Sequence, residues 1–114
     1  MAEARFIANE VTHAAMEPHS TLASFELDPH TGKLGRLTVW SSTQVPYYLQ
    51  HKLSLVLEMP MSQIRVIKPL VGGGFGGKSE VIPLEIIAAV AARKALAPVK
   101  ITYTREEVLS LIHI

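Results

Sequence analysis

The chain has 114 residues, of which 48% are hydrophobic and 18% are charged, and its formal net charge is +1. This length suits one domain with a modest core. The near-neutral charge argues against binding to nucleic acid or to an anionic membrane surface. The sequence contains no cysteine, which excludes disulfides, cysteine nucleophiles and iron–sulfur clusters held by this chain. The first residues do not resemble a signal peptide, so a cytoplasmic protein is expected.

Two strands joined by a turn are predicted first. Every second residue from Ala23 to Leu27 is apolar, which favours a strand over residues 20–27. Residues 28–33 contain proline and glycine at positions typical of a turn. Residues 37–42 are rich in Val, Trp and Thr and predict a second strand. The two strands should form an antiparallel hairpin.

A helix is predicted after the hairpin. Pro46 suits its first turn, Thr43 is a candidate cap, and Pro60 ends it. Four apolar side chains recur at helical spacing and define one buried stripe: Leu49, Leu53, Val56 and Leu57.

The second half of the chain predicts a strand over residues 63–71, a helix from about 80 to 96, and a last strand over 99–104. The helix is apolar nearly all round, so we expect it to pack partly against protein outside this chain. Thr104 and Glu107 form a capping-box pattern that starts a further helix. The fold class is therefore α+β, with the order β-β-α-β-(Gly-rich loop)-α-β.

A glycine cluster is the most distinctive stretch of the sequence. Five of the seven glycines lie within residues 72–77, between the third strand and the following helix. Glycine is favoured where the backbone needs positive φ or must approach another group closely. Bare N–H groups between a strand and a helix also suit an anionic or oxygen-rich ligand. The alternative is a tight turn with no ligand, although a turn needs only one or two glycines.

Two nucleotide-binding patterns occur in this loop. G-x-G-x-x-G, starting at Gly72, is the dinucleotide fingerprint, and G-x-x-x-x-G-K-S, ending at Ser79, is the P-loop. A run of glycines produces both patterns easily. A P-loop needs an unbroken helix from Lys78, which Pro83 would interrupt. The dinucleotide motif needs an acidic residue at the end of a second strand, whereas residues 99–104 lead into an arginine. A P-loop-like nucleotide-binding module stays open as an alternative.

A third interpretation comes from a family resemblance. VGGGFGGK, residues 71–78, resembles the glycine loop of the molybdenum-binding subunit of the xanthine dehydrogenase/aldehyde oxidoreductase family. Further segments agree in order: HAAMEPH at 13–19, WSSTQVP at 40–46, and PVK at 98–100 leading to TREE at 104–107. Within the family, the chain is most similar to the large (alpha) subunit of 4-hydroxybenzoyl-CoA reductase.

The resemblance implies a fragment of a larger enzyme. Residues 1–108 would be the N-terminal part of a domain that binds molybdenum-molybdopterin in its dinucleotide form. [2Fe-2S] clusters and FAD are expected on partner subunits or domains, and the catalytic base belongs to a later part of the family sequence. Residues 109–114 match nothing expected of the family, so we predict a non-native sequence end there. The isolated fragment is expected to be inactive.

The resemblance also implies cofactor-binding residues. Gln44 would hydrogen-bond an oxygen ligand of the molybdenum, although taken alone a glutamine there would more often satisfy a local N–H. Gly74, Phe75 and Gly76 would pack against the pterin–molybdenum end and offer N–H donors. The Phe75 ring would line the substrate pocket, with a core anchor for the loop as the alternative. Lys78 would be a surface charge or an ion-pair partner.

The residues after the loop bear on the substrate. Purine-oxidising relatives carry a glutamate directly after Gly-Gly-Lys, where this chain has Ser79, with Glu80 one position later. This counts against a purine and is compatible with an aromatic acyl thioester, such as 4-hydroxybenzoyl-CoA undergoing reductive dehydroxylation, or with an aldehyde. A xanthine- or aldehyde-type hydroxylase is the alternative.

A metal site at His13, Glu17 and His19 is disfavoured. Their spacing is not a standard zinc pattern, and Pro18 disrupts any helix that would align them. Met16-Glu17-Pro18 is instead interpreted as packing and turn structure.

Overall fold

The computed structural model describes residues 4–9 and 11–111. Its elements are β1 (Ser20–Leu27), β2 (Leu34–Ser41), α1 (Pro46–Leu57), the 3-10 helix η1 (Met61–Gln63), β3 (Ile64–Ile67), α2 (Pro83–Ala95), β4 (Val99–Thr102) and α3 (Arg105–Ser110). The predicted α+β class and element order are confirmed. The capping box is also confirmed, because Thr104 Oγ1 accepts from the Glu107 N–H at the start of α3.

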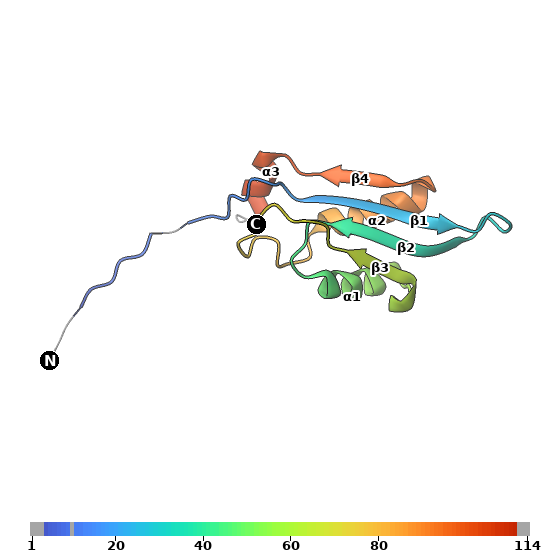
Figure 1. Ribbon diagram of the computed structural model, residues 1–114, viewed down its shortest axis with the longest axis horizontal. Helices are drawn as coiled ribbons and strands as arrows, with labels where there is room; N and C mark the ends of the chain where they lie inside the picture. The colour runs from blue at the N-terminus through green and yellow to red at the C-terminus, as the bar shows by residue number, and fades with distance from the viewer. Residues whose placement is uncertain (1–3, 10, 112–114) are drawn as a thin grey trace.

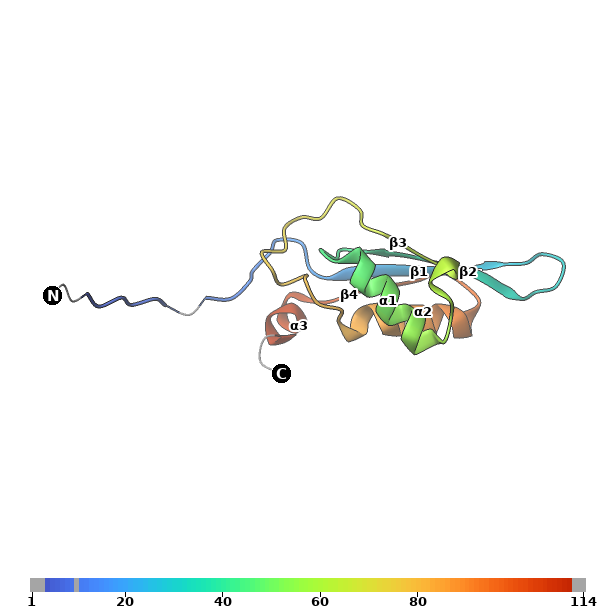
Figure 2. The ribbon, with the colours of Figure 1, turned by 90° about the horizontal axis from the view of Figure 1, so that it is seen from below.

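The four strands form one mixed sheet in the order β3-β2-β1-β4. β1 pairs antiparallel with β2 and β4, whereas β2 and β3 are parallel. Both α1 and α2 lie on one face of the sheet (Figure 1). In Figure 2 the chain after β3 runs over the opposite face and returns around the end of the sheet to α2. The glycine loop therefore lies where β1 begins and β2 ends.

The hairpin turn is built by local hydrogen bonds. Asp28 Oδ1 accepts from the N–H groups of His30 and Thr31 at 2.8 and 3.1 Å, and Gly32 has a φ of +65°. These contacts confirm the predicted turn. β2 begins at Leu34, earlier than predicted, because its pairing with β1 continues to the turn.

The core lies between the sheet and the two helices. Fully buried apolar side chains come from β1, β2, α1 and α2: Ala23, Leu37, Val39, Leu49, Leu53, Ala88, Ala89 and Ala92. Three of the four residues of the predicted α1 stripe are buried, but Val56 is half exposed because it lies at the margin of the stripe. Leu27 is 46% exposed, since the hairpin extends beyond the helices (Figure 1).

Further predictions of where elements begin and end are wrong. β4 ends at Thr102 rather than at residue 104. β3 ends at Ile67 rather than at residue 71, because the chain leaves the sheet to cross its open face. α2 begins at Pro83 rather than at residue 80, since proline is tolerated only in the first turn. Thr43 does not cap α1. Its Oγ1 accepts from the N–H of Val45, which is itself the N-cap residue.

The face of α2 that meets the sheet carries small side chains, and Glu85 is buried among them. Ile87 on the same helix is 55% exposed. That α2 packs against protein outside this chain stays a prediction. Among the helices that the structure describes, none combines the length and apolar character needed to cross a membrane.

Candidate functional site

Two separate structural requirements explain why the glycine loop, residues 72–77, is rich in glycine. Gly73 and Gly76 have φ values of +93° and +90°, which side chains disfavour. Gly72 and Gly74 need space instead, because a Cβ on Gly72 would lie 2.8 Å from Glu17 Cβ, and one on Gly74 would lie 2.5 Å from Gln44 Oε1. Both predicted reasons for the cluster are therefore present, and the close approaches are to the protein's own side chains.

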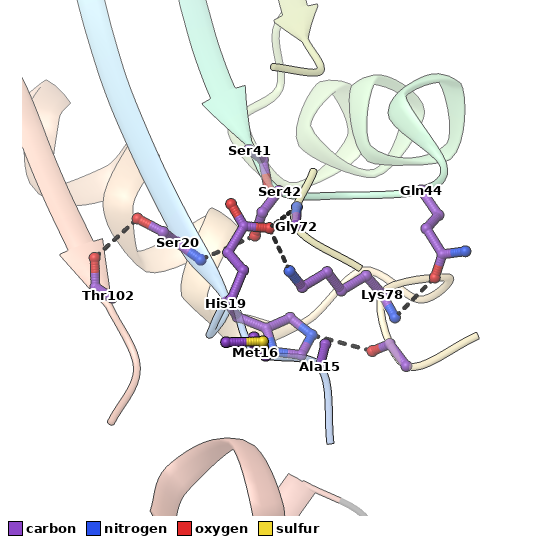
Figure 3. A network of polar contacts seen from close by, with 12 residues as sticks. Ala15, Met16, His19, Ser20, Ser41, Ser42, Gln44, Gly72, Lys78 and Thr102 are labelled. Atoms are coloured by element: carbon purple, nitrogen blue, oxygen red, sulfur yellow. Dashed lines mark hydrogen bonds and ion pairs between the residues drawn. The ribbon is translucent and has the colours of Figure 1, made fainter. Parts of the chain in front are cut away.

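Gln44 lies between β2 and α1 and is held by the chain that follows the loop. Its N–H donates to the Lys78 carbonyl at 2.8 Å. Its Oε1 accepts from the Lys78 N–H at 3.2 Å (Figure 3). The same oxygen accepts from Ser79 Oγ at 3.3 Å. The side chain is exposed, and its Nε2 donates to no group in residues 4–9 and 11–111. The Gln44 amide thus presents a fixed, unused donor beside Gly74.

Phe75 is 74% exposed and adopts a φ of +54°. The alternative interpretation as a core anchor is therefore wrong. Its ring stays close to the loop, since a Cβ on Gly73 would meet Phe75 Cε2 at 3.0 Å. Within the described residues, the N–H groups of the four residues 73–76 donate to no protein acceptor. The loop therefore has donors available for a ligand.

Lys78 is a buried ion-pair partner. Its side chain is 1% exposed, and Nζ lies 2.7 Å from Oε2 of Glu17. The same oxygen accepts from the Gly72 N–H at 2.8 Å. Burial alone raises the pKa of the Glu17 carboxyl, but the hydrogen bonds from Lys78 and Gly72 outweigh it and lower the pKa below its ordinary value. Of the two predicted roles for Lys78, the ion pair is confirmed and the surface charge is wrong.

The same geometry bears on the P-loop alternative. A P-loop lysine needs a free ammonium and a helix that begins beside it. The Lys78 ammonium is bonded to Glu17, and α2 begins only at Pro83. Neither requirement of a P-loop is met.

His19 binds the last residue of the glycine loop, Gly77. Its Nε2–H donates to the Gly77 carbonyl at 3.0 Å, while its Nδ1 is buried and has no partner among the described residues. Burial is the main cause that lowers the pKa of His19, which favours the neutral ring. Within residues 4–9 and 11–111, no group of three or more His, Asp or Glu side chains could hold a metal ion.

A cavity of about 330 Å³ adjoins the exit of the loop. His13, Gly76, Ser79 and Glu80 are among its lining residues. Gln44 lies against Gly74 of the loop and accepts from Ser79. The roles of Gln44, Gly74, Phe75, Gly76 and Ser79 toward a cofactor or substrate stay a prediction. Glu17 as an anchor of the loop was missed, because its partners lie 55 and 61 residues away along the chain.

A family model described as the molybdopterin cofactor-binding domain matches residues 1–112. The chain belongs to this family. It is 33% identical over 106 residues to the aldehyde oxidoreductase molybdenum-binding subunit PaoC of Escherichia coli K12, covering 93% of this chain and 14% of that protein. It is 37% identical over 97 residues to the xanthine dehydrogenase molybdenum-binding subunit of Escherichia coli O157:H7, covering 85% of this chain and 12% of that protein.

Among solved structures, quinoline 2-oxidoreductase from Pseudomonas putida 86 is similar, with a TM-score of 0.74 and 30% identity over 82% of this chain and 11% of that chain. The chain thus spans only a small part of the length of each relative. The predicted resemblance to the xanthine dehydrogenase/aldehyde oxidoreductase family is confirmed. The assignment of residues 1–108 to one native domain part, and of 109–114 to a non-native end, stays a prediction. Residues 112–114 lie outside the described residues.

Proposed function

We propose that this chain forms one wall of the molybdopterin site in the large subunit of a cytoplasmic molybdenum oxidoreductase. The observation that carries the proposal is the Gln44 amide. Lys78 and Ser79 hold its Oε1, so its Nε2 is left as an oriented donor at the glycine loop. Family membership supports the choice of cofactor.

The chemistry of the donors fits this group. A neutral amide orients an oxygen ligand of a metal without changing the net charge of the site. The N–H groups of Gly74, Phe75 and Gly76 add donors for oxygen or nitrogen atoms of the pterin. When bound, the molybdopterin cofactor supplies two-electron redox chemistry. The chain contributes binding and orientation, and the base comes from outside it.

For the substrate, we propose an aromatic or heteroaromatic compound, with 4-hydroxybenzoyl-CoA as the specific candidate. Ser79 donates to Gln44, so the first position after Gly-Gly-Lys serves the glutamine and offers no carboxylate to a purine. The exposed Phe75 ring can pack against an aromatic ring. The partners would be subunits that carry [2Fe-2S] clusters and FAD, and the cofactor would be a dinucleotide.

Replacing Gln44 by alanine tests the cofactor site. In the holoenzyme that contains this chain, Gln44→Ala should lower kcat by about 10- to 100-fold, because an oriented donor to the metal ligand is lost. The Mo(V) electron paramagnetic resonance spectrum should change, while the molybdenum content measured by mass spectrometry falls less than kcat. An unchanged spectrum and unchanged kcat would contradict the proposal.

A substrate panel separates the two reaction classes. The holoenzyme should release the ring hydroxyl of 4-hydroxybenzoyl-CoA when a low-potential electron donor is supplied. The similar proteins named for aldehyde and xanthine favour the alternative, a hydroxylase that passes electrons from substrate to acceptor. Oxidation of an aldehyde or of xanthine, without reduction of the thioester, would decide for that alternative.

A further inference from the structure

Both ends of the glycine loop are tied to one oxygen atom. Glu17 Oε2 accepts from the Gly72 N–H at 2.8 Å, where the loop begins, and from Lys78 Nζ at 2.7 Å, where it ends. A Cβ on Gly72 would lie 2.8 Å from Glu17 Cβ, so this contact requires a glycine. The Glu17 carboxylate therefore links the first residue of the loop to the residue that follows it.

The Lys78 ammonium depends on this carboxylate. The lysine side chain is 1% exposed, and Glu17 is its one acidic partner among the described residues. An ammonium withdrawn from water needs a charged or hydrogen-bonding partner, so loss of Glu17 would force Lys78 to move toward solvent.

Together with Ser79, Lys78 also orients Gln44. Its N–H donates to Gln44 Oε1, and its carbonyl accepts from the Gln44 N–H at 2.8 Å. In Figure 3 the Lys78 side chain extends from Gln44 toward Gly72. A movement of Lys78 would therefore displace the Gln44 amide directly.

The segment that carries Glu17 is itself anchored. Arg105 of α3 donates to the carbonyls of Ala15 and Met16, both at 2.6 Å. His19, which follows Glu17 by two residues in the chain, donates to the Gly77 carbonyl. Hydrogen bonds therefore anchor the backbone just before Glu17 and the side chain of His19 just after it, and these contacts fix the position of the Glu17 carboxylate.

We propose that Glu17 and Lys78 form a positioning pair that holds the glycine loop, and through Lys78 the Gln44 amide, in the geometry that receives the cofactor. This inference rests on the proposed function of Gln44. Neither residue is catalytic, and the Lys78 ammonium is a structural charge rather than an anion ligand.

The test uses Glu17→Gln and Lys78→Met in the holoenzyme. Each should lower kcat about tenfold with less than twofold change in KM, and each should shift the Mo(V) spectrum in the direction of the Gln44→Ala spectrum. The double variant should lose no more than the worse single variant, because the two groups act as one unit. Lys78→Arg keeps the charge and should retain most of the activity.

Glu26→Gln and Lys33→Met are matched controls, because both residues are exposed and lie in or beside the distal hairpin turn. Wild-type kcat and spectrum in Glu17→Gln and Lys78→Met would overturn the positioning pair. If Gln44→Ala changes kcat and the Mo(V) spectrum while these two variants do not, the positioning pair is wrong and the proposed function stands. If Gln44→Ala is also unaltered, the proposed function fails. Should Lys78→Met not assemble, Glu17→Gln decides, since its amide oxygen can still accept from Gly72.

Discussion

Replacing Gly74 by alanine is expected to lower kcat of the holoenzyme by about 100-fold, the scale of an ångström-sized displacement of a site group. A Cβ at this position would lie 2.5 Å from Gln44 Oε1 and 2.7 Å from its Cδ. The φ of Gly74 is not positive, so the backbone accepts alanine and the clash with Gln44 is the whole effect. Steady-state kinetics with molybdenum quantification measures it.

Gly35→Ala is the control for this substitution. A Cβ on Gly35 would meet only ordinary van der Waals contacts, at 3.5 Å from the Glu26 carbonyl oxygen. This variant should keep wild-type activity. In Gly74→Ala combined with Gln44→Ala the clash is absent, so activity should equal that of Gln44→Ala alone. Wild-type turnover by Gly74→Ala would contradict the close packing of the loop on Gln44.

The stability of α2 is expected to fall as the pH rises from about 4.5 to about 7. Glu85 is buried under the sheet, and burial raises its pKa to about 7, although the Ile82 N–H and the Ser41 hydroxyl donate to it at 2.9 and 3.1 Å. Between the two pKa values the folded chain holds a proton that the unfolded chain releases. Stability therefore decreases with pH in this window, by on the order of 3 kcal/mol in total.

Hydrogen exchange of peptides from α2, corrected for the intrinsic pH dependence of exchange, measures this change in the holoenzyme. Protection should fall by about two orders of magnitude between pH 4.5 and pH 8. Glu85→Gln should remove the dependence, because the amide is neutral throughout and can still accept from Ile82. Glu58→Gln, at an exposed carboxylate, should leave it intact. If the protection of α2 in the wild-type protein does not change with pH, the pKa of Glu85 is not raised by folding and the prediction is wrong.

Local chemistry made much of the fold predictable from the sequence. Alternation identified β1, the proline and glycine of residues 28–33 identified the turn, and the Thr104 capping box identified α3. The motifs at residues 71–78 and 40–46 also led to the family, which the comparisons show, whereas Gln44 as a cofactor residue stays a prediction. These features depend on residues that are near neighbours in the chain, so their pattern is visible without coordinates.

Only the tertiary structure decided why individual residues stand in the loop. Gly74 is a glycine because Gln44 lies against it, and Lys78 is buried because Glu17 comes from 61 residues earlier to meet it. The exposure of Phe75 and the burial of Glu85 likewise depend on packing between distant segments. Contacts of this kind leave no period or spacing in the sequence, because they are set by how the sheet, the helices and the N-terminal segment meet.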